Sequence, residues 1–498
     1  MPSRPHKTSA TPSPPSSIVR SPTYTTASGT RPSQPPQKPT TPAIALNAWT
    51  HINTEETKAT MNSIHSGAPS DPCPHFIFNK ADNIIAPHLQ TIINSLFASA
   101  TFPESWKHAE VNALLKKPTA DPSDLKNFRP ISLPPFPAKV IEKTINKQLT
   151  NFLEDNNLLD PSQSGFRSNH SRRNRPHLSH RRHQNSDGQR RNNPTEIICS
   201  VPQGSSLSPT LFNVYMSPLA AIVRKHNINI TSYADDTQLI LSLTKDPTSA
   251  KTNLQDEMKD VAEWMKLSCL KLNSDKTEVL ILGNTPSAWD DSWWPTALGT
   301  APTPSDHARN LGFILDPLLT IIKQVNAVSS SCFLTLRMLR KIFRWIPADT
   351  RKTVTHALVM SRLDYGNTLY AGTTAKLQKR LQRIQNASAR LVLDIPRNWL
   401  PVNKRITFRL LTHAHKALHN KVPEYLNRRL SFYMPTRQLR STNLALAAVP
   451  RIRRTTAGGK SFSYLAAKTW NSLPTNLRTT QDHLAFRRQL KTWLFEQQ

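Results

Sequence analysis

The stretch Ser232-Tyr233-Ala234-Asp235-Asp236-Thr237-Gln238-Leu239 places two adjacent carboxylates between two short runs of apolar or alternating residues. These runs, at 227–230 and 239–241, predict two β-strands joined by a tight turn, with Asp235 and Asp236 at its tip. Two neighbouring carboxylates repel each other, but together they can hold divalent metal ions against a triphosphate during phosphoryl transfer. An Asp-Asp pair in a turn is more often a solvated loop, so the surrounding sequence has to decide between these interpretations.

The chain is strongly basic. Its 498 residues include 64 Lys and Arg against 33 Asp and Glu, which leaves a formal net charge of +31. An excess of this size favours a polyanionic partner, and nucleic acid is the commonest one. A membrane surface is the rival partner, and we expect none because no apolar stretch reaches the roughly 18 to 20 residues that span a bilayer.

The compartment expected from the sequence is the cell interior. The N-terminus lacks the apolar core of a signal peptide, so the protein is expected in the cytoplasm, the nucleus or both, and not to be secreted. Four cysteines are scattered without any C-x-x-C pair, which predicts neither a disulfide framework nor a zinc site. They are Cys73, Cys199, Cys269 and Cys332.

Composition divides the chain into parts. Residues 1–43 contain 11 of the 41 prolines, mixed with Ser and Thr, so residues 1–45 are expected to be a disordered tail. Order is expected from about Asp71, with a helical lead-in at 70–100.

Apolar periodicity predicts several helices and a further strand. Ser208 is the expected N-cap of one helix, whose inner face would carry Tyr215 among other apolar residues. A strand is expected at 277–282, and the chain is expected to be mostly helical beyond about residue 320. The other predicted helices span 138–153, 247–265, 375–393 and 486–495.

Several motifs occur in a fixed order along residues 70–498. They are Trp106-Lys107 with Leu114-Leu115-Lys116-Lys117, Asn127-Phe128-Arg129-Pro130-Ile131-Ser132-Leu133, Gln163-Ser164-Gly165-Phe166-Arg167, Val201-Pro202-Gln203-Gly204-Ser205, Tyr233-Ala234-Asp235-Asp236, Leu272-Asn273 through Lys276-Thr277-Glu278, Leu311-Gly312, Ser361-Arg362-Leu363-Asp364-Tyr365 and Trp470-Asn471-Ser472-Leu473-Pro474. In this order they resemble the reverse transcriptases of non-LTR (LINE-type) retrotransposons.

The resemblance implies an α+β right-hand polymerase with fingers, palm and thumb. Residues 100–316 would form the fingers and palm, and residues 320–498 a helical thumb and C-terminal region. It also implies RNA-templated DNA synthesis, with an RNA template, a DNA primer or target and dNTPs as partners.

The resemblance further implies roles for individual residues. Asp235 and Asp236 would hold two Mg²⁺ ions, because Mg²⁺ prefers carboxylate oxygens, and Lys276 would neutralise or protonate the leaving pyrophosphate. Gly204 would let the backbone approach a base pair, and Gln203 would hydrogen-bond the template. The remaining substrate- and template-binding residues would be Tyr233 and the phosphate-binding cations Lys116, Lys117, Arg129 and Arg167.

One family motif is missing. Motif A, an apolar strand with a metal-binding aspartate, should lie between Phe166 and Val201, but this interval is several tens of residues too short. Residues 167–191 hold eight arginines, four histidines, one acid (Asp187) and one aliphatic residue (Leu178), which is unlike a central palm strand. Glu196 stands on a better strand candidate, 196–199, which resembles the strand leading into motif B.

Three interpretations of this interval stay open. It can be a deletion or a shifted reading frame, an arginine-rich arm that folds on RNA, or a metal-binding tract formed by its histidines. Under the first interpretation the palm is incomplete around 167–195 and catalysis is impaired. The alternative function is then a non-catalytic, sequence-indifferent nucleic-acid-binding remnant of a decayed element.

Overall fold

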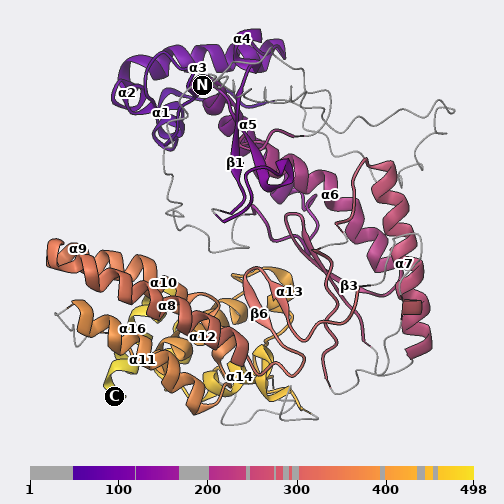
Figure 1. Cartoon of the computed structure of the whole chain (residues 1–498), viewed down its shortest axis with the longest axis vertical. Coiled ribbons are helices and arrows are strands. Elements are labelled where there is room, and N and C mark those ends of the chain that lie inside the picture. The colour runs from indigo at the N-terminus through magenta and orange to yellow at the C-terminus, as the bar shows by residue number, and fades with distance from the viewer. Residues whose placement is uncertain are drawn as a thin grey trace, which may run out of the picture. The chain divides into compact units, whose positions relative to one another are not determined.

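The structure is a computed structural model that describes residues 49–117, 119–167, 201–242, 247–273, 276–283, 291–293, 302–392, 399–434, 444–452 and 458–497 (Figure 1). The predicted tail at 1–45, the Arg- and His-rich interval and the strand expected at 196–199 lie outside these residues. The described part mixes helices with short antiparallel strands, in agreement with the α+β class. None of its helices combines the length and apolarity that a membrane span requires.

The first described region is a small helical core. Its helices are α1 (Thr54–Asn62), α2 (His75–Lys80), α3 (Asp82–Ser99), α4 (Glu104–Lys107) and α5 (Phe136–Asp155). Met61, Ile93 and Phe136 are fully buried between them, and the ring of Phe78 stacks on that of Phe136 with centroids 4.5 Å apart. The α5 helix confirms the one predicted at 138–153.

Helix α1 corrects the expectation that order begins near Asp71. Its sequence contains a single large apolar residue, Met61, so apolar periodicity does not reveal it. The available signal was a capping box, in which the Asn53 side chain accepts from the Glu56 backbone N–H while the Glu56 carboxylate accepts from that of Asn53.

The strands of the described residues form three separate two-stranded antiparallel sheets. The pairs are β1 (Glu110–Leu115) with β2 (Phe128–Leu133), β3 (Asn229–Tyr233) with β4 (Asp236–Ile240), and β5 (Ala308–Asn310) with β6 (Phe313–Leu315). The strand predicted at 277–282 was wrong, because only Val279 forms a bridge, to Pro304. Proline has no N–H to continue a ladder.

Helices α6 (Ser208–Lys225) and α7 (Pro247–Leu267) pack against each other and enclose a core with β3. That core includes Leu219, Val223, Ile230, Leu254, Met258, Val261 and Trp293. Two details differ from expectation. Ser208 is the first helical residue, not the N-cap, and its hydroxyl donates to the Pro202 carbonyl at 2.8 Å. Tyr215 is 49% exposed, and its hydroxyl donates to the carbonyl of Ser268, directly after α7.

The described residues after 320 are mostly helical, as predicted. A first bundle comprises α8 (Ile322–Ile342), α9 (Ala348–Thr355), a π-helical turn (His356–Met360), α10 (Ser361–Asp364) and α11 (Ala375–Val392). Its core contains Val325, Cys332, Val359, Leu381 and Ile384. Short 3-10 turns complete the described structure at Leu125–Asn127, Asp291–Trp293, Phe343–Trp345, Asn367–Tyr370 and Gly458–Lys460.

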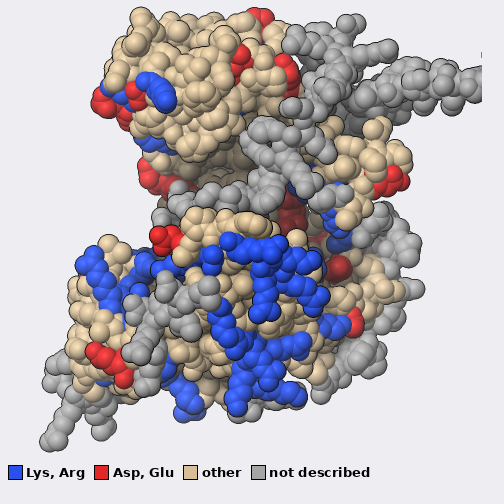
Figure 2. Space-filling model, turned by 60° about the vertical axis from the view of Figure 1, so that its left-hand side comes forward, with Lys and Arg blue, Asp and Glu red and all other residues tan. Residues whose placement is uncertain are grey.

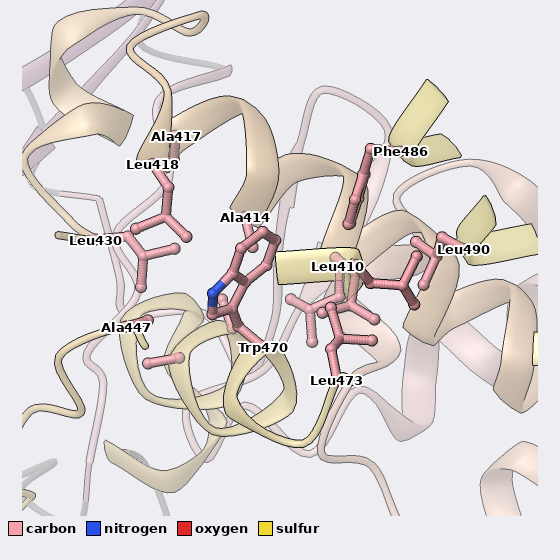
Figure 3. Packing of buried hydrophobic residues seen from close by; sticks show 14 of the residues in the cluster. Leu410, Ala414, Ala417, Leu418, Leu430, Ala447, Trp470, Leu473, Phe486 and Leu490 are labelled. Carbon is pink, nitrogen blue, oxygen red and sulfur yellow. The ribbon is translucent and has the colours of Figure 1, made fainter. Parts of the chain in front are cut away.

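A second helical core closes around Trp470 (Figure 3). Its helices are α12 (Val402–Leu418), α13 (Glu424–Asn427), α14 (Phe462–Asn471), α15 (Thr475–Arg478) and α16 (His483–Glu496). Trp470 is fully buried and its indole N–H donates to the Ala445 carbonyl at 2.9 Å. Phe486 and Leu490 of α16 are also fully buried, so the C-terminal helix packs on the rest of the region.

Candidate active site

The two carboxylates lie at the tip of the β3–β4 hairpin, as predicted. Tyr233 pairs with Asp236 as the last rung of the ladder, and Ala234 and Asp235 form the two-residue turn. Asp235 and Asp236 are both exposed. The sequence places them side by side with no intervening residue, so a cation between them would relieve their mutual repulsion.

A neighbouring segment, residues 162–165, holds this turn in place. The Gln163 side chain donates from Nε2 to the Ala234 carbonyl at 3.1 Å and accepts from the Ala234 N–H at 2.9 Å. The backbone of Ser164 donates to the Ser232 carbonyl, and the Ser232 N–H donates to the Ser162 carbonyl. These bonds explain how Ala234 keeps a φ of 56°, a left-handed conformation that alanine rarely adopts.

Gly165 is required by close contact with the same turn. A Cβ at this position would lie 2.4 Å from the Ala234 nitrogen. The Gly165 carbonyl accepts from the buried Asn213 amide at 2.7 Å, which ties the segment to α6. Gln163 and Asn213 are therefore site-positioning residues that sequence reasoning missed. The turn requires them, but no pattern of charge or periodicity marks them.

Gln203 and Gly204 lie against β2. The Ser132 N–H donates to the Gln203 carbonyl at 2.6 Å, and Gly204 has a φ of +119°. A Cβ on Gly204 would lie 2.3 Å from the Ser132 carbonyl oxygen. The glycine is thus needed for packing against a neighbouring strand, and its approach to a base pair stays a prediction.

Comparison with known proteins identifies the stretch that contains the hairpin. Residues 184–315 match the family profile described as reverse transcriptase (RNA-dependent DNA polymerase). The chain therefore carries a reverse transcriptase domain.

Three Drosophila melanogaster proteins are similar to the chain over more residues than the reverse transcriptase profile matches. The probable RNA-directed DNA polymerase from transposon BS is 23% identical over 373 residues, which covers 62% of this chain and 41% of the relative. The RNA-directed DNA polymerase from mobile element jockey is 23% identical over 256 residues, which covers 39% of this chain and 28% of the relative. The probable RNA-directed DNA polymerase from transposon X-element is 22% identical over 376 residues, which covers 61% of this chain and 40% of the relative. The chain spans less than half the length of each of these relatives.

An ion pair holds the side chain of Arg167 close to the segment that supports the hairpin. Its guanidinium donates to both oxygens of the Glu154 carboxylate at 2.9 and 2.6 Å and to the Asp160 carbonyl at 2.7 Å. Its side chain is 8% exposed. In this arrangement Arg167 stabilises the segment that supports the hairpin, and its donors are not directed at a phosphate.

Asp160 joins the same network from its side chain. Burial raises the pKa of this carboxyl, but hydrogen bonds from Arg224 and Ser162 more than offset the effect and hold the pKa below its usual value. The Arg224 guanidinium donates to both carboxylate oxygens, at 2.6 and 2.7 Å. The loop that precedes the hairpin support is therefore anchored to α6.

The remaining predicted phosphate-binding and catalytic cations lie on exposed surface. Lys116 and Lys117 follow β1, and Arg129 lies on β2 opposite Leu114. Lys276 is also exposed, and its backbone N–H donates to the Asn273 carbonyl. Lys116 donates its ammonium group to the Lys126 carbonyl. The structure brings Gln163, Gly165 and the two aspartates together in one site. The roles of the cations stay predictions.

Proposed function

We infer that the chain derives from an RNA-directed DNA polymerase of a non-LTR retrotransposon, with Asp235 and Asp236 as the metal-binding pair of its nucleotidyl-transfer site. The observation that carries this proposal is the hairpin tip, which presents two adjacent exposed carboxylates on a turn fixed by Gln163. The family uses divalent metal ions, a nucleic-acid template and primer, and nucleotides. For this chain the partners would be an RNA template, a DNA primer or target and dNTPs.

The two aspartates suit Mg²⁺ in chemistry and exposure, because a hard cation prefers carboxylate oxygens. Two such ions, when bound, would stabilise the charge of the attacking and leaving oxygens. Within the described ranges, however, no group of three or more His, Cys, Asp or Glu side chains is placed to hold a metal ion. The protein groups described here thus supply a pair of ligands and not the full set.

We further infer that catalysis is impaired by the loss of motif A. Among the described residues β4 pairs with β3 alone, and its Ile240 is 54% exposed, as expected for a palm sheet without its neighbour. The alignment with the first relative extends over 373 positions yet uses 62% of this chain, so several tens of positions have no counterpart here. Loss of a metal ligand that contributes about 4 kcal/mol slows transfer roughly a thousandfold.

The proposed architecture follows the family. Residues 100–316 would form fingers and an incomplete palm, residues 320–498 the thumb and C-terminal region, and residues 1–45 a disordered tail. The proposed location is inside the cell, in the cytoplasm, the nucleus or both. Lys276, Tyr233 and the phosphate-binding cations Lys116, Lys117 and Arg129 keep their proposed roles, while the buried ion pair of Arg167 favours a structural one.

Primer extension on an RNA template with Mg²⁺ and dNTPs tests the proposal. The chain is compared with an Asp235→Asn, Asp236→Asn variant and with an Asp256→Asn, Asp349→Asn control. The control removes the same charge from two exposed positions outside the hairpin. Slow extension by the chain and the control, and none by the hairpin variant, would support the proposal. Equal background from all three proteins would refute catalysis at this site.

The second candidate function is a non-catalytic, sequence-indifferent nucleic-acid binder. The net charge of +31 favours it, and Figure 2 shows Lys and Arg gathered on one face in the lower half of the view. Binding of this kind weakens steeply as salt rises, because each phosphate contact releases counterions. An affinity that stayed constant between low and physiological salt would exclude it.

A further inference from the structure

A basic cleft lies between helices α8 and α11, outside the hairpin site. Its volume is about 980 Å³, which is in the range of pockets that hold small organic ligands. One turn at its mouth comes from residues 372–374, and Lys460 lines it from the 3-10 turn Gly458–Lys460.

The wall formed by α11 is a row of cations. Lys376, Lys379, Arg380 and Arg383 are spaced so that they share one side of the helix, and all four are exposed. The row extends along about 10 Å of helix. Within the described residues none of these four side chains forms an ion pair, and no acidic residue lines the cleft.

Two of the cations around the cleft are positioned by neutral partners. The Arg380 guanidinium donates to the Asn326 side chain of α8, and the Lys460 ammonium donates to the Leu319 carbonyl at 2.9 Å. Because these partners carry no negative charge, they orient the two cations without neutralising them. Such an arrangement suits an anionic ligand.

The floor of the cleft is apolar and includes an aromatic ring. Ile322 and Phe333 of α8 line it together with Leu377 of α11. Phe333 is 43% exposed, so its ring is accessible to a ligand in the cleft. A phosphate gains nothing from contact with an apolar surface, whereas the face of an unstacked base can stack on it.

We propose that the α8–α11 cleft binds single-stranded nucleic acid, with phosphates along the Lys376–Arg383 row and one base stacked on Phe333. A duplex would satisfy the cations but would keep its bases stacked on each other, away from the apolar floor. The site is separate from the Asp235–Asp236 hairpin. The inference shares with the proposed function only the class of partner.

Binding of short fluorescent oligonucleotides to the full chain, measured by anisotropy in EDTA, tests the proposal. The probes are an oligouridylate, the matching oligothymidylate and a blunt duplex of the same length. Phe333→Ala should weaken binding of both single strands about tenfold and leave the duplex unchanged. Leu334→Ala is the matched control, because Leu334 is the adjacent residue, is also exposed (59%) and lies outside the cleft.

The cationic row is tested by Arg380→Glu with Arg383→Glu. This variant should weaken single-strand binding at least tenfold and lower its salt dependence. An Arg340→Glu, Lys341→Glu variant makes the same change in net charge on α8, away from the cleft, and should change binding less than about threefold. Equal losses in the two charge variants would refute a specific cleft.

A crosslinking arm locates the base. A single strand carrying 5-iodouridine should crosslink to the peptide that contains Phe333, and the crosslink should disappear in Phe333→Ala. Loss of duplex and single-strand binding to the same extent, or no loss in Phe333→Ala, would overturn the stacked base. Because EDTA removes metal-dependent catalysis from these measurements, their failure and a failure of primer extension are separate results.

Discussion

The hairpin region, residues 201–293, and the C-terminal core, residues 399–497, are stabilised in different ways. The hairpin tip is exposed and owes its shape to polar contacts from residues 162–165. The C-terminal core encloses Trp470, Phe486 and His415 without any exposure. The candidate chemistry therefore sits on a turn held by a few polar contacts, whereas Trp470 lies in a large apolar core of the described residues.

The largest predicted effect breaks the C-terminal core. Trp470→Ala should lower the free energy of unfolding of this region by about 3–5 kcal/mol, because it removes a buried ring and leaves a cavity. Hydrogen exchange of peptides from α12, α14 and α16 measures the loss, and peptides from α6 and α7 should keep their protection. Trp345→Ala is the control, since Trp345 is 77% exposed. Equal losses in the two variants would contradict the assignment.

Acid should also destabilise the C-terminal core. Burial lowers the pKa of His415 to about 4, although its hydrogen bond with the Thr480 carbonyl acts in the opposite direction. Between pH 6.5, the usual pKa of histidine, and pH 4, the unfolded chain therefore binds more protons at this residue than the folded chain does. Stability should fall by about 3 kcal/mol as pH drops through this window. Protection of α12 measured at several pH values checks this, and His415→Phe should flatten the dependence.

The hairpin region should respond to pH with the opposite sign. Burial raises the pKa of Glu257 in α7 to about 7, and both carboxylate oxygens lack a hydrogen-bond partner. The folded chain binds the extra proton here, so stability is fully present below pH 4.5 and is lost as pH rises to about 7. The expected loss is about 3 kcal/mol at most.

Protection of α7 peptides across the same pH series measures this second effect. Glu257→Gln, which is neutral at every pH, should abolish the dependence while Asp256→Asn preserves it. If α7 and α12 lost protection in the same direction, the contrast between the two regions would be wrong.

The smallest predicted effect concerns two glycines in loops, Gly204 and Gly283. Gly204 and Gly283 have nearly equal φ angles, +119° and +116°, but a Cβ would clash with Ser132 at Gly204 and meet nothing within 4 Å at Gly283. Gly204→Ala should therefore cost about 1–3 kcal/mol more than Gly283→Ala, because only it adds overpacking to conformational strain. Protection of β2 and α6 peptides compares the two, and equal costs would remove the packing explanation.

The sequence predicted those features that follow from periodicity and from local turn chemistry. Alternation on both sides of Asp235-Asp236 was sufficient for the hairpin, and helical spacing was sufficient for α5, α7, α11 and α16. It failed where a partner decides the outcome. The strand at 277–282 needed a neighbour with free N–H groups, and Pro304 cannot provide them.

The sequence indicated the charged residues of the candidate site, but it did not indicate the residues that hold them in place. Adjacent acids are visible in any sequence, whereas the role of Gln163 depends on a turn that lies 71 positions away in the chain. Arg167 shows the converse case. Its charge suggested phosphate binding, but Glu154 on α5 takes up its donors, and only the folded arrangement reveals that pairing.

The anchoring of Arg167 and Gly204 also marks two positions between which a segment of a related protein could be inserted. Residues 168–200 are bracketed by two fixed points, one tied to Glu154 and the other seated on Ser132. Insertion of a longer palm segment from a related reverse transcriptase between these points would test whether the two anchors tolerate added chain length. Such a chimera would test whether the chain shows polymerase activity once a palm strand of the family is supplied.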